Sequence, residues 1–508
     1  MPDETAGAPA AAVHETHAGL VVLVGDRAYK IKKAICTPFL DFTTPQRRLA
    51  ALQRELDLNR RMAPDVYLGL VHVSALSPTG SSPDGIPAEH ALVMRRMPAE
   101  RSLAALARAG ADVEDDLRGL ARLVAVFHSH ADRGPQIAAE GGRDALRARW
   151  TANIAELRAV HGPVARTIDA IEDLALRFLD GRGPLFADRV SDDRILDGHG
   201  DLIAADVFFL DDGPRVLDCL EFDDRLRFVD ALDDVSFLAM DLERLGCPDL
   251  AHRFLRAYIE FSGDPAPVSL RHHYIAYRAL VRAKVSWIRH TQGDPSAAEE
   301  AEQHTAITLR HLCEGEVRLV LVGGLPGTGK TTLAGGLADR FGAAVLSSDR
   351  IRKELAGINP TTHATAGYLQ GIYSPERTDK LYAELLRRAE SLLTQGESVV
   401  LDASWTSRPY RQHADELARR THSRIIQLRC ETPPELAAER IARRVGSASD
   451  ANLPIAAAMS EDADPWPEAV TIATSQPIAE SLHLAEGVWR GIDPGARRAG
   501  ENMRSSGV

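Results

Sequence analysis

Near the N-terminus, hydrophobic residues fill two short segments, 20–24 and 28–32, on either side of a Gly-Asp pair. Apolar segments around such a turn predict two antiparallel strands. Side chains alternate between the two faces of a strand, so Ala28, Lys30 and Lys32 share one face of the second predicted strand. Lysines on a strand that faces a cleft can bind phosphates.

Farther along, helical patterns dominate. Thr44 followed by Pro45 predicts the start of a helix with leucines three and four residues apart and with Glu55 beside this apolar stripe. Segment 91–94 predicts another strand, and 117–130 predicts an amphipathic helix. The remaining predictions for this half are helical segments at about 135–180 and 231–312, with loops and brief strands over 182–234.

Beyond residue 315, short hydrophobic strands alternate with helical segments. This alternation predicts an α/β domain with a parallel sheet covered by helices. The order of residues from Thr432 to Glu435 is that of a capping box. The predicted elements are strands at 317–322, 343–346, 398–401 and 424–428, and helices from Lys330, over 350–355 and from Pro433.

The length of the chain, 508 residues, exceeds what one hydrophobic core normally supports, so we expect a two-domain protein. A polar segment over 291–298 interrupts the helices of the first half, and the boundary is expected near 313–315. The predicted limits are a flexible N-terminus (1–18), a first domain (19–313), a second domain (314–488) and a disordered tail (489–508).

Composition and charge narrow the classes of partner. With 44% hydrophobic and 26% charged residues, the chain has the composition of a globular protein. A net charge of −12 argues against broad nucleic-acid binding and favours small-molecule partners. The oligomeric state is not predicted.

Cysteine usage and hydropathy bear on the compartment. The five cysteines form no CxxC pair, so the sequence suggests neither a zinc ribbon nor a disulfide framework and favours buried thiols in a reducing compartment. The N-terminus lacks a basic and apolar leader, and no apolar run reaches about 18 residues. We therefore expect a cytoplasmic protein without a membrane partner.

The most specific motif is GLPGTGKT at 324–331, which follows an apolar strand and precedes a predicted helix. This is the Walker A pattern, in which backbone N–H groups surround a polyphosphate at a helix N-terminus. Lys330 is expected to reach the β- and γ-phosphates of ATP, and Thr331 to ligate Mg²⁺. The predicted ATP-binding residues of this loop are Gly324, Gly327, Thr328, Gly329, Lys330, Thr331 and Thr332.

Charged residues that are candidates for the site follow this loop at three places in the sequence. Asp349 and Arg352 come directly after the second strand of this half; a helix-terminal aspartate is the alternative interpretation of Asp349. Asp402 ends an apolar strand and is a candidate for holding the metal, or an ordinary strand-end aspartate. Arg440 and Arg444, with Arg443 between them, share one helix face and form either a phosphate-binding lid cluster or a solvated basic face.

Segment 316–445 resembles the ATP-dependent P-loop kinases of the AAA-like family near gluconate kinase, polynucleotide kinase and zeta toxin. The order Asp349-Arg-Ile-Arg352 is similar to the DxxR segment of these kinases. The resemblance implies that Asp349 orients or deprotonates the acceptor hydroxyl, that Arg352 binds acceptor or phosphate, and that Arg440 and Arg444 contact ATP.

His199-Gly200-Asp201 resembles the catalytic loop of aminoglycoside phosphotransferases, and the order of motifs over about 20–300 is similar to that family. The resemblance implies a bilobal, protein-kinase-like α+β fold in which Asp201 is the catalytic carboxylate. It also implies that Asp218 binds Mg²⁺, with Glu221 and Asp223 as weaker candidates. The ATP-contacting positions that it implies are Lys30, its helix partner Glu55, and Met94 at the hinge.

This half departs from the family pattern in two places. Asp206 stands where the family usually has a metal-binding asparagine, and its carboxylate is still a suitable Mg²⁺ ligand. Ile203 stands where a second histidine is frequent. Lys32 shares a face with Lys30 and can exchange roles with it, and His128 is interpreted as a packed structural histidine.

Together these motifs predict a bifunctional kinase that uses ATP and Mg²⁺ to phosphorylate hydroxyls of small metabolites, sugars or amino sugars above all. One alternative is a regulatory ATP-binding protein in which one kinase domain has lost its activity. Another is that the P-loop half acts on nucleic-acid ends or as a zeta-like toxin.

Overall fold

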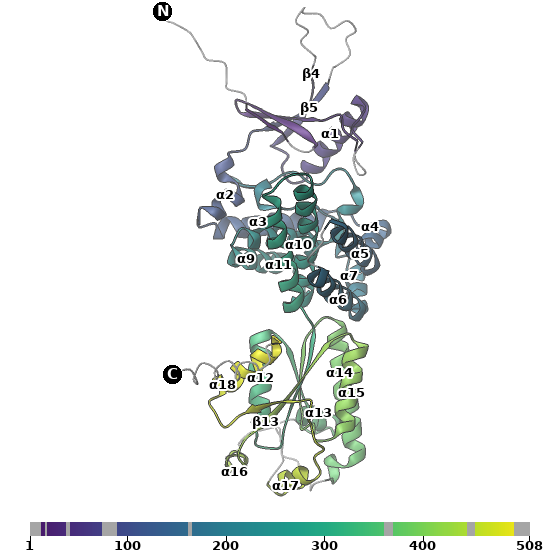
Figure 1. Cartoon of the computed structure of the whole chain (residues 1–508), viewed down its shortest axis with the longest axis vertical. Coiled ribbons are helices and arrows are strands. Elements are labelled where there is room, and N and C mark those ends of the chain that lie inside the picture. Colours follow the sequence, from purple (N-terminus) through teal and green to yellow (C-terminus); the bar gives the residue numbers. More distant parts are fainter. Residues whose placement is uncertain are drawn as a thin grey trace, which may run out of the picture. The chain divides into compact units, whose positions relative to one another are not determined.

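A computed structural model describes residues 12–15, 18–36, 41–73, 89–160, 165–359, 369–443 and 453–491. The chain forms two compact units that are not continuous in sequence (Figure 1). The first unit comprises 1–165, 187–265 and 274–308, and the second comprises 166–186, 266–273 and 309–508. Each unit is described by itself.

The first unit contains an antiparallel sheet with the strand order β1-β2-β3-β5-β4. The predicted hairpin is present, because a glycine with φ +58° makes the turn between β2 and β3. One strand lies inside segment 1–18, for which flexibility is expected, and it pairs with β2. The strands are β1 (Ala12–Glu15), β2 (Gly19–Val24), β3 (Arg27–Lys32), β4 (Tyr67–Val73) and β5 (Glu89–Arg95).

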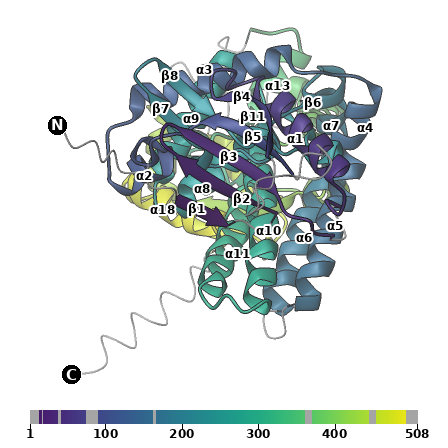
Figure 2. The same ribbon diagram turned by 90° about the horizontal axis from the view of Figure 1, so that it is seen from above.

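Helix α1 (Pro45–Asn59) packs against β5 and β4 (Figure 2). It begins as predicted, since the Thr44 hydroxyl accepts a hydrogen bond from the N–H of Arg47 at 3.3 Å. Leu52 and Leu56 are buried in a cluster with Leu92 of β5. This packing directs the Glu55 side chain of α1 toward Lys30 and Lys32 of β3.

The rest of the first unit is mostly helical, as predicted. Segment 182–234, where we expected loops and brief strands, also contains the helix α7, whose Leu185 and Phe186 side chains are buried. Short strands follow it: β6 (Ile195–Asp197), β7 (Val207–Leu210), β8 (Gly213–Val216) and β9 (Phe228–Asp230). The helices from α2 to α11, some of which contribute to the second unit, are α2 (Leu103–Arg108), α3 (Glu114–His130), α4 (Pro135–Gly141), α5 (Arg143–Val160), α6 (Ala165–Gly181), α7 (Gly183–Ser191), α8 (Ala231–Arg244), α9 (Pro248–Ser262), α10 (Val268–Thr291) and α11 (Ala297–Glu314).

The second unit is built on a parallel sheet with the strand order β11-β12-β10-β13-β14. Four of its strands were predicted, whereas β14 was missed because it is only four residues long and two of them are exposed. The central strand β10 is buried throughout, as expected where both faces are covered. The strands are β10 (Arg318–Gly323), β11 (Ala344–Ser347), β12 (Val399–Asp402), β13 (Arg424–Glu431) and β14 (Val470–Ala473).

Helices cover both faces of this sheet, α12 and α18 on one side and α14 and α15 on the other (Figure 1). The predicted capping box is wrong: α16 begins one residue later, and the Thr432 side chain makes no capping bond. Pro434 forces the residue before it, Pro433, into an extended conformation with ψ 141°, so that residue caps the helix instead. The helices are α12 (Lys330–Phe341), α13 (Ser348–Leu355), α14 (Pro375–Thr394), α15 (Arg408–Arg420), α16 (Pro434–Ala442), α17 (Leu453–Glu461) and α18 (Ile478–Trp489).

Within the described ranges, every helix is too short or too polar to cross a membrane.

Candidate active sites

The loop between β10 and α12 has a backbone that only glycine fits. Gly324, Gly327 and Gly329 have φ of +135°, +83° and +84°, values that other residues rarely adopt. A Cβ atom on Gly327 would lie 2.5 Å from the carbonyl oxygen of Ala437, and one on Gly324 would lie 2.6 Å from that of Cys430. The loop therefore wraps closely and leads into the N-terminus of α12, which is the arrangement that binds phosphates.

The side chains at the start of α12 meet the end of β12. The Thr331 hydroxyl donates a 2.8 Å hydrogen bond to Asp402, and the Lys330 ammonium donates a 3.0 Å bond to the carbonyl oxygen of Leu325. Burial raises the pKa of the Asp402 carboxyl, although Lys330 and the hydrogen bond from Thr331 oppose the rise. A hydroxyl and a carboxylate side by side fit a hard cation such as Mg²⁺.

A cavity of about 700 Å³ opens beside this loop and brings most of the predicted residues together. Asp349 lies in the first turn of α13 and lines the cavity with Arg352. The guanidinium of Arg352 donates to the carbonyl oxygen of Ile372 at 3.0 Å and lies over the ring of Tyr373. The predicted residues that line the cavity are Gly327, Gly329, Lys330, Thr331, Thr332, Asp349, Arg352, Asp402 and Arg440.

The arginines of the predicted lid differ in position. Arg440 donates a 2.8 Å bond to the carbonyl oxygen of Thr474, and its guanidinium lies beside Gly329. Arg443 is exposed and pairs with Glu439, so its environment is that of a solvated face. Arg444 lies outside the described residues.

No sequence motif predicted the aromatic part of this cavity. Tyr382 and Tyr410 stack with ring centroids 3.9 Å apart, and both line it. They come from different helices, α14 and α15, so no local motif joins them. The two tyrosines and Ser404 form a part of the cavity wall against which a small polar substrate can bind.

In the first unit, the two lysines of β3 have different partners. Lys30 pairs with Glu55 at 2.6 Å and with Asp218 at 2.7 Å, and Lys32 pairs with Glu55 at 2.7 Å and with Glu221 at 2.5 Å. The side chain of Lys32 is only 2% exposed, whereas that of Lys30 is 16% exposed. Lys30 is thus the lysine that joins the helix carboxylate to the predicted metal ligand.

The predicted hinge residue lies within the five-stranded sheet. Met94 of β5 is directly opposite Ala28 in the register of β3 and β5. Its side chain is partly buried against the apolar cluster beneath α1. The small residue and the methionine are therefore neighbours on adjacent strands, and the contact of Met94 with adenine stays a prediction.

The charges of three carboxylates in this unit influence one another's pKa values. Burial raises the pKa of Asp201 to about 6, with the charge of Asp218 adding to the rise and Arg282 opposing it. Burial raises the pKa of Asp206 well above its usual value, and the charges of Asp218 and Asp201 add to it. Lys30 holds the pKa of Asp218 low despite burial. Such a group of carboxylates suits Mg²⁺, whose charge would relieve their repulsion.

Asp218 also has an unusual backbone. Its φ is +61°, and its N–H donates to the Tyr67 hydroxyl at 3.1 Å. A left-handed conformation at a non-glycine residue is uncommon and is frequent at functional sites. The neighbouring N–H of Cys219 donates to the side chain of Asn59 at 2.9 Å, so contacts from outside the segment hold it in place.

Sequence reasoning missed the residue that anchors the HGD loop. Asp234, fully buried in α8, accepts hydrogen bonds from the N–H groups of His199 at 2.7 Å and Gly200 at 2.8 Å. His128 bridges Asp234 and the hydroxyl of Tyr258, which confirms it as a structural histidine. In the sequence, Asp234 is one of many acidic residues over 211–234, so nothing marks it as an anchor of this loop.

Comparisons with known proteins agree with these units. A family model described as an AAA domain matches residues 319–465, so the predicted P-loop domain is confirmed. The uncharacterized proteins Rv2004c of Mycobacterium tuberculosis and Mb2027c of Mycobacterium bovis are each 44% identical over 483 residues, which cover 94% of this chain and 95% of theirs.

Solved structures resemble each unit at low similarity. A sugar kinase from Janibacter sp. HTCC2649 is 22% identical and covers 35% of this chain and 97% of its own, with a TM-score of 0.27. A choline/ethanolamine kinase family protein from Mesorhizobium loti is 15% identical and covers 60% of this chain and 92% of its own, with a TM-score of 0.38. Likenesses of this size do not define a function. The identity to the mycobacterial proteins over nearly the full length does define a family, and this chain belongs to the same two-domain family as Rv2004c of Mycobacterium tuberculosis.

Proposed function

We propose that this protein is a bifunctional ATP-dependent kinase that phosphorylates hydroxyl groups of small metabolites, with sugars or amino sugars as the acceptor class. The observation that carries the proposal is the cavity beside the P-loop. There Lys330, Thr331, Asp402 and Asp349 all line one cavity, and the Thr331 hydroxyl is bonded to Asp402. These are the parts that phosphoryl transfer requires: a phosphate cradle, metal ligands and a carboxylate for the acceptor.

In the second unit, each residue has a defined task. Mg²⁺ supplies charge neutralisation when bound, and Thr331 and Asp402 are the residues that would hold it. Asp349 accepts the proton of the acceptor hydroxyl, whose oxygen forms a bond to the γ-phosphorus while the bond to the bridging oxygen of ADP breaks. Lys330 and Arg440 stabilise the charge on the transferring group and on ADP.

In the first unit, Lys30 is the proposed contact to the ATP phosphates, held in place by Glu55. Asp206 and Asp218 are the proposed metal ligands, and Asp201 orients or deprotonates a second acceptor. Asp234 fixes the backbone of the HGD loop, so that the Asp201 carboxylate is positioned before the substrates bind.

The test separates the two halves. The wild-type chain, Asp201→Ala and Lys330→Ala are each incubated with γ-labelled ATP and fractionated cell extract, and labelled metabolites are separated. We expect Lys330→Ala to lose one labelled product and Asp201→Ala to lose another. A wild-type chain that labels no metabolite above a variant carrying both Asp201→Ala and Lys330→Ala would contradict the proposal. Label on oligonucleotide ends, lost in Lys330→Ala, would favour the nucleic-acid end kinase.

One observation favours a second candidate, a regulatory first unit that binds ATP without transfer. Lys30 contacts Asp218 directly at 2.7 Å, so the proposed phosphate contact and metal ligand neutralise each other. ATP binding must separate this pair, which costs binding energy. ATP uptake abolished by Lys30→Ala, together with no labelled product that depends on Asp201, would support this candidate.

A further inference from the structure

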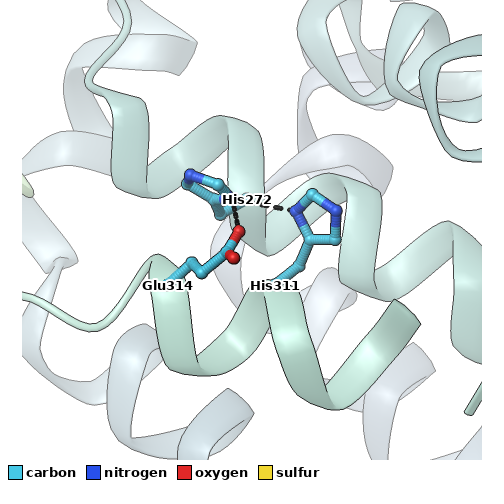
Figure 3. A group of neighbouring side chains, drawn as sticks. All are labelled: His272, His311 and Glu314. Atoms are coloured by element: carbon cyan, nitrogen blue, oxygen red, sulfur yellow. Dashed lines mark hydrogen bonds and ion pairs between the residues drawn. The ribbon is translucent and has the colours of Figure 1, made fainter. Parts of the chain in front are cut away.

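Two histidines and a glutamate that belong to neither proposed kinase site come together within the second unit. His272 lies in the first turns of α10, and His311 and Glu314 lie in the last turns of α11 (Figure 3). The two Nδ1 atoms are 2.8 Å apart, and Nδ1 of His272 is 3.8 Å from Oε2 of Glu314. One ligand atom from each residue lies within 4.8 Å of the others.

The backbone allows this approach through a glycine. A Cβ atom on Gly315 would lie 2.6 Å from the Cβ of His272, so a larger residue would push the end of α11 away from α10. His311 and Glu314 are three residues apart on one helix and therefore point to the same side. The cluster is thus set by two helix ends in close contact.

These distances fit one metal ion. Zinc bonds of about 2.0–2.2 Å to nitrogen and oxygen in a tetrahedron place ligand atoms about 3.3 Å apart, and the observed 2.8 and 3.8 Å lie on either side of that value. Two imidazoles with one carboxylate suit zinc and similar transition metals better than Mg²⁺. We propose that His272, His311 and Glu314 form a site for one divalent transition-metal ion, Zn²⁺ above all, with a fourth position open to water or a further ligand.

The surroundings bear on both access and affinity. His272 and Glu314 line a cavity of about 630 Å³, and the Glu314 side chain is 51% exposed, so an ion can enter from solvent. The guanidinium groups of Arg271, Arg310 and Arg318 lie near His272. The same arginines weaken the attraction for a cation, and the Glu314 carboxylate opposes their effect.

One contact competes with the metal. A guanidinium nitrogen of Arg310 lies 3.4 Å from Nε2 of His311, which would need Nε2 to accept a hydrogen bond and Nδ1 to carry the proton. The two imidazoles would then share a simple hydrogen bond. Arg310 is exposed, so it can turn away when the metal takes Nδ1 and the proton moves to Nε2. The experiment must therefore distinguish a metal site from a histidine pair.

The proposed metal site lies close in sequence to the first strand of the P-loop domain. Three residues separate Glu314 from β10, the strand that leads into the Walker A loop. A metal ion would fix the end of α11 to the start of α10 just before this strand. We therefore expect zinc to stabilise the second unit without taking part in phosphoryl transfer.

The test uses the full chain, stripped of metal with a chelator and titrated with Zn²⁺ alone by calorimetry, with Mg²⁺ in excess to block oxygen-rich sites. We expect one equivalent to bind, and Co²⁺ to give the absorption of a four-coordinate site. Glu314→Gln and His272→Gln should each weaken zinc binding by about tenfold or more. His413→Ala, which removes an exposed histidine of α15, is the matched control and should leave binding unchanged.

Glu314 is exposed, so its variant is expected to fold, and circular dichroism checks this for every protein used. No binding of one equivalent would reduce the cluster to a hydrogen-bonded histidine pair and overturn the proposal. Binding that both variants leave unchanged would place the zinc elsewhere and overturn it equally. A rise in the melting temperature with Zn²⁺ that is lost in Glu314→Gln would support the stabilising role.

Discussion

Asp349 and Asp402 line one cavity, yet their neighbours differ. The Asp402 side chain is buried and accepts a hydrogen bond from Thr331, whereas Asp349 is partly exposed at the start of α13. We expect Asp349→Asn to lower kcat of the P-loop half by about 100-fold or more with little change in KM for ATP, because a general base contributes about that much. Asp402→Asn should instead raise the Mg²⁺ concentration needed for half-maximal rate.

Steady-state rates against ATP and Mg²⁺ distinguish these effects. Asp339→Asn, which changes an exposed aspartate on α12, serves as the control and should behave like the wild type. An Asp349→Asn protein with full kcat would remove this carboxylate from the chemistry.

In the first unit, the carboxylate of Asp201 gives a prediction about pH. Burial raises its pKa to about 6, and the nearby Asp218 charge adds to the rise. Since the ionised form accepts the proton, kcat/KM of this half should fall as the pH drops below about 6. The raised pKa also means that ionisation of Asp201 destabilises the folded state. The contribution of this carboxyl to the free energy of unfolding is therefore fully present below about pH 4 and is lost as the pH rises through 6.

The pH profile is measured on Lys330→Ala, so that only the first unit contributes. A profile that stays flat between pH 5 and 7.5 would contradict this assignment of the base.

Cysteine exposure corrects an expectation from the sequence. All five thiols were expected to be buried, but Cys36 and Cys313 are exposed. Burial raises the pKa of Cys219 and of Cys430 to about 12, which keeps them as unreactive thiols. A thiol reagent should therefore label Cys36 and Cys313 in the native protein and all five after unfolding, counted by mass spectrometry. Protection of Cys36 would contradict the exposed position.

At the scale of elements, two glycines near the P-loop allow a matched comparison. Gly327 has φ +83°, and its Cβ would lie 2.5 Å from a carbonyl oxygen of α16. Gly335 lies inside α12, and its Cβ would meet nothing within 4 Å. We expect Gly327→Ala to abolish ATP binding to the second unit and to lower its stability. Gly335→Ala should raise its stability by about 0.5–1 kcal/mol, because alanine loses less entropy in a helix.

Denaturant unfolding and ATP titration of both variants check this pair. Normal ATP affinity in Gly327→Ala would mean that the loop tolerates a side chain and is not the cradle described above.

Element prediction succeeded where local chemistry decided the outcome. Thr44 and Pro45 define the start of α1, and alternation along β3 placed Lys30 and Lys32 on one face, where both pair with Glu55. Prediction failed where contacts with distant segments determine whether an element forms or what a residue does. Strand β14 is short and half exposed, and only pairing with β13 makes it a strand. Asp234 looks like any acid near a helix N-terminus, and its role depends on a loop 34 residues away.

At the scale of the whole molecule, the sequence predicted two domains in the correct order. It did not predict which segments of the chain belong to each unit. Segments 166–186 and 266–273 belong to the second compact unit although they precede residue 313. Arg182 shows why: it is buried and donates a 2.7 Å hydrogen bond to the carbonyl oxygen of Thr421. Such a contact over 239 residues leaves no pattern in the local sequence.

Two compact units, each with a proposed nucleotide site, imply an unfolding experiment. Each unit has its own hydrophobic core, so we expect thermal unfolding to deviate from a single two-state transition. A ligand that binds only the folded state at about 100 times its Kd adds about 2.7 kcal/mol to the stability of the unit that binds it. MgATP should therefore raise the temperatures of both unfolding transitions in the wild type. It should raise only that of the first unit in Lys330→Ala and only that of the second unit in Lys30→Ala. A variant with both substitutions should show neither shift. Calorimetric scans at several ATP concentrations measure these shifts. A transition that MgATP never moves would mean that its unit does not bind the nucleotide, and the claim of two ATP sites would fail for that unit alone.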